Sequence, residues 1–314
     1  MADRKRRRVT TAIDVEAAAK GLGFLAAGVA TLDPNEHGAV LDRWLASGHA
    51  GTMRYLHRQA AKRKAPAKIV PGATRAVMVL DNYFQPDPPG AGVRIAKYAR
   101  GRDYHVELLD RLRQLGAWLT ERGATIVRPY ADDGPVPERE LAARAGLGWI
   151  GKNTMLIRPG TGSFFFIGAI LTDLVIEPTP PLETDHCGTC TRCIEACPTE
   201  AILETRVLDA SRCISFLTIE YKKEPPPELA ARYQGFAFGC DICNDVCPWN
   251  ERFAAPTSVA AYQDRTAVPR QDPGYFARMT ETEFADRFGD TPLERPGLAG
   301  MRRNFTHAFA SLDS

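Results

Sequence analysis

The sequence predicts an α/β layered domain, followed by a cysteine-rich region and a short helical C-terminal region. Helix-like and strand-like segments alternate up to about residue 176, and a proline-rich stretch, IEPTPPLETD, follows them. All eight cysteines lie after that stretch. Alternating helices and strands are typical of a sheet covered by helices. The predicted divisions are a disordered basic tail at 1–11, the α/β domain at 12–180, the cysteine-rich domain at 181–255 and the helical region at 256–314.

The composition permits a packed core and sets few limits on partners. The chain has 314 residues, of which 44% are apolar, as is ordinary for a chain of two domains. Its net charge of +2 permits a nucleic-acid partner without requiring one. The basic run at residues 4–8 fits a solvated tail, and an RNA-binding arm is the alternative. Because the chain has neither an apolar signal segment nor an apolar stretch of about 18 residues, we expect it to be cytoplasmic.

The first half of the α/β domain is predicted from its apolar spacing. Residues 12–60 suggest two helical pieces, and the apolar run at 76–80 suits a buried strand. A strong helix follows Asp103, a candidate N-cap, and ends before Gly123. Its buried face is expected to carry Val106, Leu109, Leu112 and Leu119.

The second half of the domain continues the alternation. Residues 124–130 predict a strand and residues 138–146 a helix. The stretch 154–174 predicts two strands around a Pro-Gly turn, the second one long and apolar. Residues after about 280 are charged and helical, with breaks at prolines and glycines.

The cysteines follow a spacing that belongs to one kind of metal site. The first motif is C-x2-C-x2-C-x3-C-P, the bacterial ferredoxin spacing, in which three thiolates bind one 4Fe–4S cluster and the fourth reaches a second cluster. The second motif, CDICNDVCP, lacks its first cysteine because that position is Ala237. One cysteine, Cys213, lies outside both motifs and can supply the missing ligand. The cysteine-rich domain is therefore predicted to be ferredoxin-like, with two clusters.

Two clusters need eight ligands, and the eight cysteines supply them if each cluster takes one cysteine from the other motif. The ligands of the first cluster are Cys187, Cys190, Cys193 and Cys247. The ligands of the second cluster are Cys197, Cys213, Cys240 and Cys243. The alternatives are a zinc site, which would favour two C-x2-C pairs separated by a longer gap, and disulfides, which are rare in the cytoplasm. Two adjacent cubanes conduct single electrons, so the preceding domain should hold an electron acceptor.

Two segments of the first domain carry candidate site residues. In PYADDGPVPERELAARAGLGWIGKNTMLI, Asp132 or Asp133 is a candidate general acid, and the alternative is that both are turn formers. The glycines of GLGWIG follow a helix instead of a strand, so they do not predict a Rossmann site. The segment KYARGRDYH interleaves cations with aromatic residues, which suits phosphates and unstacked bases, although a solvated face explains it equally well.

Seven segments in order resemble the epoxyqueuosine reductase family, which completes queuosine synthesis in bacterial tRNA. The likeness runs from about residue 15 to residue 310. The segments are KRKAPAKIVPGA, YARGRDYH, DDGPVPERELAARAGLGWIGKNTMLI, GSFFFIGAILTDL, CGTCTRCIEACPTEAI, RCISFLTIE and GCDICNDVCPWN. The resemblance implies a corrin-binding domain with a nitroreductase-like sheet, followed by the two clusters. It also implies base-off cobalamin reduced by those clusters, and reduction of epoxyqueuosine at the wobble position with loss of water.

The resemblance also implies particular residues. The family's D-T-G aspartate falls on Asp132, the expected proton donor, and Asp133 replaces the usual threonine. The implied cobalamin contacts are Arg63, Ala96, Asp132, Gly151, Leu156, Ile167, Ser215 and Asp241. Cations expected to face the tRNA are Lys97, Arg100, Arg102 and Lys222. No D-x-H-x-x-G motif is present, so the corrin would bind without a histidine ligand to cobalt.

The expected partners follow from this chemistry. They are a tRNA carrying epoxyqueuosine and an external low-potential electron donor, without a membrane, and we expect a monomer. Many relatives continue into helical repeats after the clusters, and this chain resembles the shorter forms. Two other hypotheses are open: a corrinoid-dependent enzyme on a small molecule, similar to reductive dehalogenases, and a non-catalytic electron carrier.

Overall fold

The computed structural model describes residues 9–312. Most of the predicted basic tail therefore lies outside the described residues. Its last residue, Thr11, is structured, because its side chain caps helix α1 (Ala12–Gly21) by accepting a hydrogen bond from the Asp14 N–H. Within the described range, none of the helices is long and apolar enough to cross a bilayer.

A four-stranded sheet in the order β1-β2-β7-β4 forms the centre of the first region, and each neighbouring pair is antiparallel. Its strands are β1 (Ala26–Thr31), β2 (Arg75–Asn82), β4 (Val127–Tyr130) and β7 (Phe165–Thr172). The middle strands are buried on both faces and therefore consist of nearly unbroken apolar runs. The mixed α/β architecture predicted from the sequence is thus confirmed.

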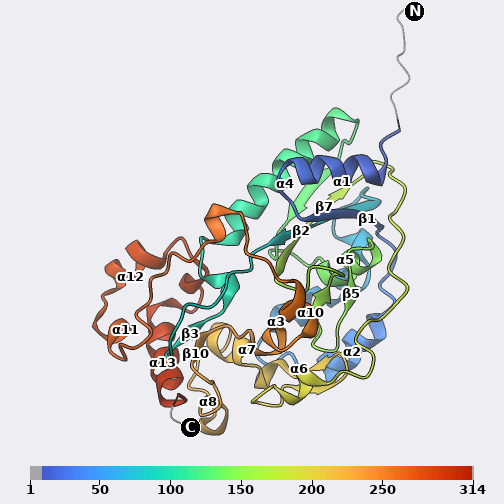
Figure 1. Cartoon of the computed structure of the whole chain (residues 1–314). Helices are drawn as coiled ribbons and strands as arrows, with labels where there is room; N and C mark the ends of the chain where they lie inside the picture. The colour runs from blue at the N-terminus through green and yellow to red at the C-terminus, as the bar shows by residue number, and fades with distance from the viewer. Residues whose placement is uncertain (1–8, 313–314) are drawn as a thin grey trace, which may run out of the picture.

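Each face of the sheet has its own apolar core. Val77 and Val79 of β2 point toward α1 and α4 (Tyr104–Glu121), whereas Met78 and Leu80 point toward α5 (Glu138–Arg144). Figure 1 shows α1 and α4 above the sheet and α5 below it. The end of α5 comes very close to β1, where a Cβ on Gly28 would lie 2.1 Å from the Ala145 carbonyl oxygen.

Three details of the sequence prediction were wrong. Residues 12–60 contain β1 besides α1, α2 (Gly38–Ala46) and α3 (Arg54–Lys64). The small residues of β1 give no strand signal, and the segment is extended because it pairs with β2. In α4, Leu112 and Leu119 are fully buried as expected, but the other fully buried leucines are Leu108 and Leu115; Leu109 is only partly buried and Val106 is 46% exposed. The short strand β6 (Leu156–Ile157) pairs with β5 (Trp149–Ile150) and not with β7.

The cysteine-rich region is built from short elements. Its helices are α6 (Arg192–Glu195), α7 (Ile214–Ile219), α8 (Pro227–Ala230), α9 (Ile242–Asp245) and α10 (Pro248–Phe253). Its strands are β8 (Ile202–Glu204), β9 (Val207–Leu208) and β10 (Phe236–Phe238), and β10 pairs in parallel with β3 (Arg94–Ile95). The region is thus tied to the first domain through a backbone ladder.

The C-terminal helices share a core with that ladder. They are α11 (Tyr275–Arg278), α12 (Glu281–Phe288) and α13 (Gly297–Ala310), at the left of Figure 1. Phe276, Phe288 and Phe305 pack with Ile95 and Phe238. Single 3-10 turns lie at Pro66–Lys68, Lys97–Ala99, Ala210–Arg212, Ala260–Tyr262 and Pro292–Glu294.

Candidate functional site

Four cysteines from both motifs meet at one cavity. Cys187, Cys190, Cys193 and Cys247 line a space of about 120 Å³, together with Ile157 and other neighbours. Cys193 lies in α6, and Cys247 immediately precedes α10. This is the set that the spacing assigns to the first cluster, including the crossed ligand from the second motif. Iron ligation by these four residues stays a prediction.

The remaining four cysteines also lie near one another, and each is partly buried. Burial raises the pKa of the Cys243 thiol well above its usual value, and the nearby Cys213 and Cys197 add to the effect. Burial also raises the pKa of Cys240 well above its usual value, and the nearby Cys243 and Cys213 raise it further. Buried thiols of this kind become thiolates readily only when metal ions offset their charge. The donor set therefore fits the second predicted cluster.

A mononuclear metal fits this arrangement less well. Within residues 9–312, no three His, Cys, Asp or Glu side chains are grouped as a single metal ion would require. A cubane holds its thiolates farther apart, because each one binds a different iron. The ferredoxin spacing of the cysteines along the chain thus favours 4Fe–4S clusters over the zinc alternative.

Asp132 occupies a strained turn that follows β4. Its φ of 58° lies in the left-handed region, which is uncommon for a residue with a side chain. The backbone N–H of Asp132 donates to Glu138 Oε1 at 2.8 Å. The Tyr104 hydroxyl donates to Asp132 Oδ2, also at 2.8 Å. These bonds hold both the backbone and the carboxyl group of Asp132 in one orientation.

Arg63 and Glu138 complete the surroundings of this turn. The guanidinium of Arg63 donates to the carbonyl oxygens of Gly134 and Val136 at 3.2 and 3.3 Å, while its Nε is buried without a partner. Burial and then the charge of Asp132 raise the pKa of Glu138 to about 8. Sequence reasoning did not identify Glu138 or Tyr104 as site residues. Tyr104 belongs to the aromatic and basic segment noted above, but no spacing rule connects it to Asp132.

The implied cobalamin contacts lie toward both the Asp132 turn and the second set of cysteines. Tyr98 lies between these two ends: burial raises its pKa, and the charges of Asp132 and Asp241 add to the rise. Its ring contacts that of Tyr104 edge to face, with centroids 6.2 Å apart. Ala96 packs against the backbone beside Cys240, since a Cβ on Gly239 would lie 2.6 Å from the Ala96 Cβ.

The other implied contacts come from four separate elements. Leu156 is buried in β6 and Ile167 lies in β7, while Ser215 in α7 comes two residues after Cys213. Gly151 follows β5, and a Cβ there would lie 2.5 Å from Ile157 Cδ1. Leu156, Ile167 and Gly151 carry no polar side chain, and the side chain of Ser215 hydrogen-bonds with Cys213. Their part in binding stays a prediction.

Two of the four cations expected to face tRNA have another role. Lys97 is only 3% exposed, and its ammonium group donates to Asp245 at 2.7 Å and to Asp87 at 3.1 Å. Arg100 is 5% exposed and pairs with Asp87. The physical reason is that the buried carboxylates beside the second set of cysteines need opposite charges. The expectation that these two cations face RNA is therefore wrong for this conformation.

The other two cations are exposed. Arg102 precedes α4, and Lys222 follows α7. The ammonium group of Lys222 donates to the carbonyl oxygens of Ile219 and Arg295 at 3.1 and 2.9 Å. Both side chains are accessible to a phosphate, and their contact with RNA stays a prediction.

Known proteins resemble this chain over most of its length. Residues 63–133 match the family profile "Epoxyqueuosine reductase QueG, DUF1730", and residues 186–250 match the "4Fe-4S double cluster binding domain". The epoxyqueuosine reductase of Pseudomonas aeruginosa is 40% identical over 291 residues, covering 90% of this chain and 80% of the relative. That of Cyclobacterium marinum is 39% identical over 295 residues, covering 92% and 94%.

Solved structures agree with the sequence comparisons. Epoxyqueuosine reductase from Streptococcus thermophilus superposes with a TM-score of 0.86 at 27% identity, covering 96% of this chain and 81% of that one. An epoxyqueuosine reductase crystallised with an epoxyqueuosine-modified tRNA-Tyr stem loop gives a TM-score of 0.84 at 27% identity, with the same coverage. The two matched family models span Asp132 and all eight cysteines. The chain therefore belongs to the epoxyqueuosine reductase family.

Proposed function

We propose that this protein reduces epoxyqueuosine at the wobble position of tRNA to queuosine. The observation that carries the proposal is the arrangement of Asp132, which lies in a strained turn and is linked through Tyr104 and Tyr98 to the cysteine-rich side of the molecule. Support comes from the curated relatives named epoxyqueuosine reductase and from the related structure with a modified tRNA stem loop. The net reaction takes two electrons and two protons, and the epoxide oxygen leaves as water.

The residues fit the cofactors that this reaction needs. Two sets of four cysteines would hold two 4Fe–4S clusters, and the buried unpartnered Nε of Arg63 would be satisfied by a polar group of a bound cobalamin. The proposed contacts at Ala96 and Asp241 would place that cobalamin next to the second cluster. When bound, these groups would supply the two electrons of the reaction.

Asp132 is the proposed proton donor to the epoxide oxygen. Opening the epoxide builds negative charge on that oxygen, and a positioned acid contributes about 10²–10⁴ in rate. Tyr104 orients the carboxyl group through its bond to Oδ2. Glu138, with a pKa of about 8, is mostly neutral at pH 7 and so adds little negative charge beside Asp132.

The turn that carries Asp132 is proposed to move. In the related enzyme from Bacillus subtilis, the catalytic loop is swung out of the active site. In this chain the Asp132 turn is held by Arg63 and Glu138. These two residues would act as positioning residues, because they contact the backbone of the turn and leave its carboxyl group to the substrate.

The test is anaerobic turnover of tRNA that contains epoxyqueuosine, with and without added cobalamin. Asp132→Asn should keep tRNA and cobalamin binding and lose turnover about 10²- to 10⁴-fold. Asp133→Asn is the matched control, since the Asp133 carboxyl accepts the Ala131 N–H at 3.0 Å and forms part of the turn. The reverse pattern would assign the acid to Asp133, and full activity of both variants would require another proton source.

The same assay separates the other hypotheses. A protein that binds cobalamin in stoichiometric amounts is not a simple electron carrier, and one that binds tRNA is not specialised for a small halogenated molecule. We also propose a cytoplasmic location, a monomeric state and an external low-potential electron donor. Size measurement of the anaerobic protein tests the monomer.

A further inference from the structure

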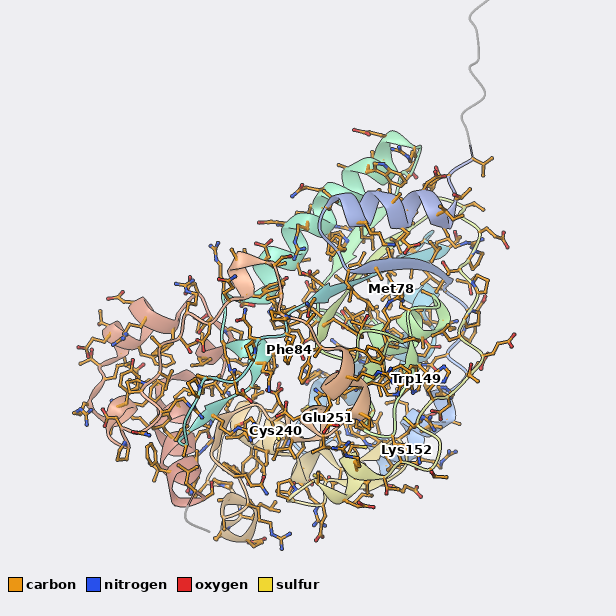
Figure 2. The ribbon with its side chains drawn as sticks, viewed as in Figure 1. Met78, Phe84, Trp149, Lys152, Cys240 and Glu251 are labelled. Atoms are coloured by element: carbon orange, nitrogen blue, oxygen red, sulfur yellow. The ribbon has the colours of Figure 1, made fainter. Side chains whose placement is uncertain are left out.

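Trp149 makes a contact with a cluster cysteine that the proposed reaction does not use. Its indole Nε1–H donates to Cys187 Sγ, with the nitrogen 3.5 Å from the sulfur. Trp149 is 6% exposed and packs with Ile157 and Cys247, so the contact is shielded from water. In the view of Figure 2, Trp149 and Cys240 lie on opposite sides of Glu251.

The position of this indole ring is well determined. Trp149 lies in β5, whose pairing with β6 sets Trp149 opposite Ile157. The preceding residue permits that pairing because it is glycine: a Cβ on Gly148 would lie 2.3 Å from the Ile157 carbonyl oxygen. Trp249 meets the ring edge to face, with centroids 5.1 Å apart, and His186 does so at 5.0 Å. Backbone and neighbours together aim the N–H at the sulfur.

Several other cluster sulfurs accept from backbone amides. Cys197 Sγ accepts from the Ala201 N–H at 3.3 Å. Cys213 accepts from the amides of Ser215 and Phe216, and Cys247 from those of Trp249 and Asn250. A backbone amide cannot be removed without altering the chain, whereas the indole N–H of Trp149 can be removed by one substitution.

We propose that Trp149 raises the reduction potential of the first cluster by donating its indole N–H to the Cys187 sulfur. The inference rests on the ligand assignment made in the proposed function. Reduction adds one electron and one negative charge to the cluster, and no bond to the indole is made or broken. A hydrogen bond to the sulfur stabilises the more negative, reduced form more strongly, which makes the cluster easier to reduce.

A raised reduction potential at the first cluster would favour the entry of electrons at that cluster. The residues around the first motif, including His186, Gly188 and Arg192, are exposed, whereas Asp241 and Ile242, between Cys240 and Cys243 of the second set, are buried. The first cluster is thus the one that an external donor can approach. A raised potential would let that cluster collect electrons from the donor before they pass inward.

The test is a potentiometric titration of the anaerobic holoprotein, followed by the electron paramagnetic resonance signals of the reduced clusters. In Trp149→Phe the ring is kept and the N–H is lost. At a fixed potential, the ratio of reduced to oxidised first cluster should fall about three- to tenfold, which is the size of one hydrogen bond. A tenfold fall corresponds to about 59 mV for a one-electron couple. The second cluster should not shift.

Trp249→Phe is the matched control. It removes an indole from the same aromatic group, but that indole N–H contacts no cysteine sulfur among the residues the structure describes. An unchanged midpoint in the Trp249 variant supports the proposal. Equal shifts in the two variants would assign the effect to ring packing and overturn it, as would an unshifted midpoint in Trp149→Phe with full iron.

A second measurement keeps the inference testable if the variant loses its cluster. In the reduced wild-type protein, electron–nuclear double resonance should detect a strongly coupled proton that exchanges slowly with deuterium, as expected for a buried N–H on a cluster sulfur. Labelling the tryptophan indole with nitrogen-15 should identify that group, and absence of the nitrogen coupling would overturn the proposal. A wild-type protein that carries no 4Fe–4S iron would instead contradict the cofactor assignment itself.

Discussion

The sheet and the cysteine-rich region are held together in different ways. In the sheet, β2 and β7 pair along eight residues, and apolar side chains cover both faces. Between residues 186 and 250, the α-helices have only four to six residues. A helix that short is not stable alone. The first region is thus stabilised by burial, and the second is expected to depend on its cysteines binding metal.

The proposed active site lies between these two kinds of structure. The sheet side contributes the strained turn at Asp132, which a rigid scaffold can hold. The cysteine side contributes a paired charge network, in which Lys97 contacts Asp241 and Asp245. Substitutions should therefore have different consequences on the two sides, and the following predictions test that difference.

The largest effect is expected from Cys213→Ala, because it removes a ligand from the region that depends on metal. The variant should hold about half of the iron and lose turnover, since one of two clusters is incomplete. The amides of β2 and β7 should keep their protection from hydrogen exchange. Iron analysis and exchange mass spectrometry measure both outcomes. Full iron loading would show that Cys213 is not a ligand.

The next largest effect is expected in the sheet core. Leu112 of α4 is fully buried, and a Cβ on Gly168 of β7 would lie 3.0 Å from its Cδ1. Leu112→Ala should lower the free energy of unfolding by about 2–5 kcal/mol and leave the iron content unchanged. Val106→Ala, on the exposed side of the same helix, is the control and should change stability by less than about 0.5 kcal/mol. Loss of iron in Leu112→Ala would show that the two regions are not independent.

A smaller effect is expected from the pH dependence of Glu138. Its pKa is raised from 4.5 to about 8, so the folded protein keeps a proton that the unfolded chain has released between those values. The stability from this group is therefore complete below the unfolded pKa and is lost as the pH rises through the folded pKa. Thermal unfolding should show wild type losing stability relative to Glu138→Gln as the pH rises from about 5 to about 9. Parallel pH profiles would show that Glu138 is not protonated as proposed.

The smallest effect is expected from the exposed cations. If each cation contacts one phosphate, Arg102→Gln and Lys222→Gln should each reduce the steepness of the plot of log binding constant against log salt concentration. The expected reduction is about 0.7–0.9 for each variant. Lys97→Met is the contrasting variant, because its buried ammonium group pairs with Asp245. It should lower stability and leave the salt slope unchanged. Binding measured at several salt concentrations distinguishes the two groups of cations.

Local patterns in the sequence determined a substantial part of this protein. The spacing of the cysteines predicted the grouping of Cys187, Cys190 and Cys193, because three ligands spaced two residues apart can reach three corners of one cubane. Asp103 was correctly predicted to cap α4, because capping depends on atoms two or three residues apart. The seven segments that resemble the family also identified the Asp132 turn. Each of these features depends on neighbours in the chain.

Only the tertiary structure decided the features that depend on residues far apart. β1 is a strand because β2 pairs with it, Lys97 is buried because it faces Asp245, and Glu138 titrates unusually because the turn brings Asp132 to it. The contact between Trp149 and Cys187 joins positions 38 residues apart. Burial and charge pairing depend on which surfaces meet after folding, and no local pattern in the chain records that information.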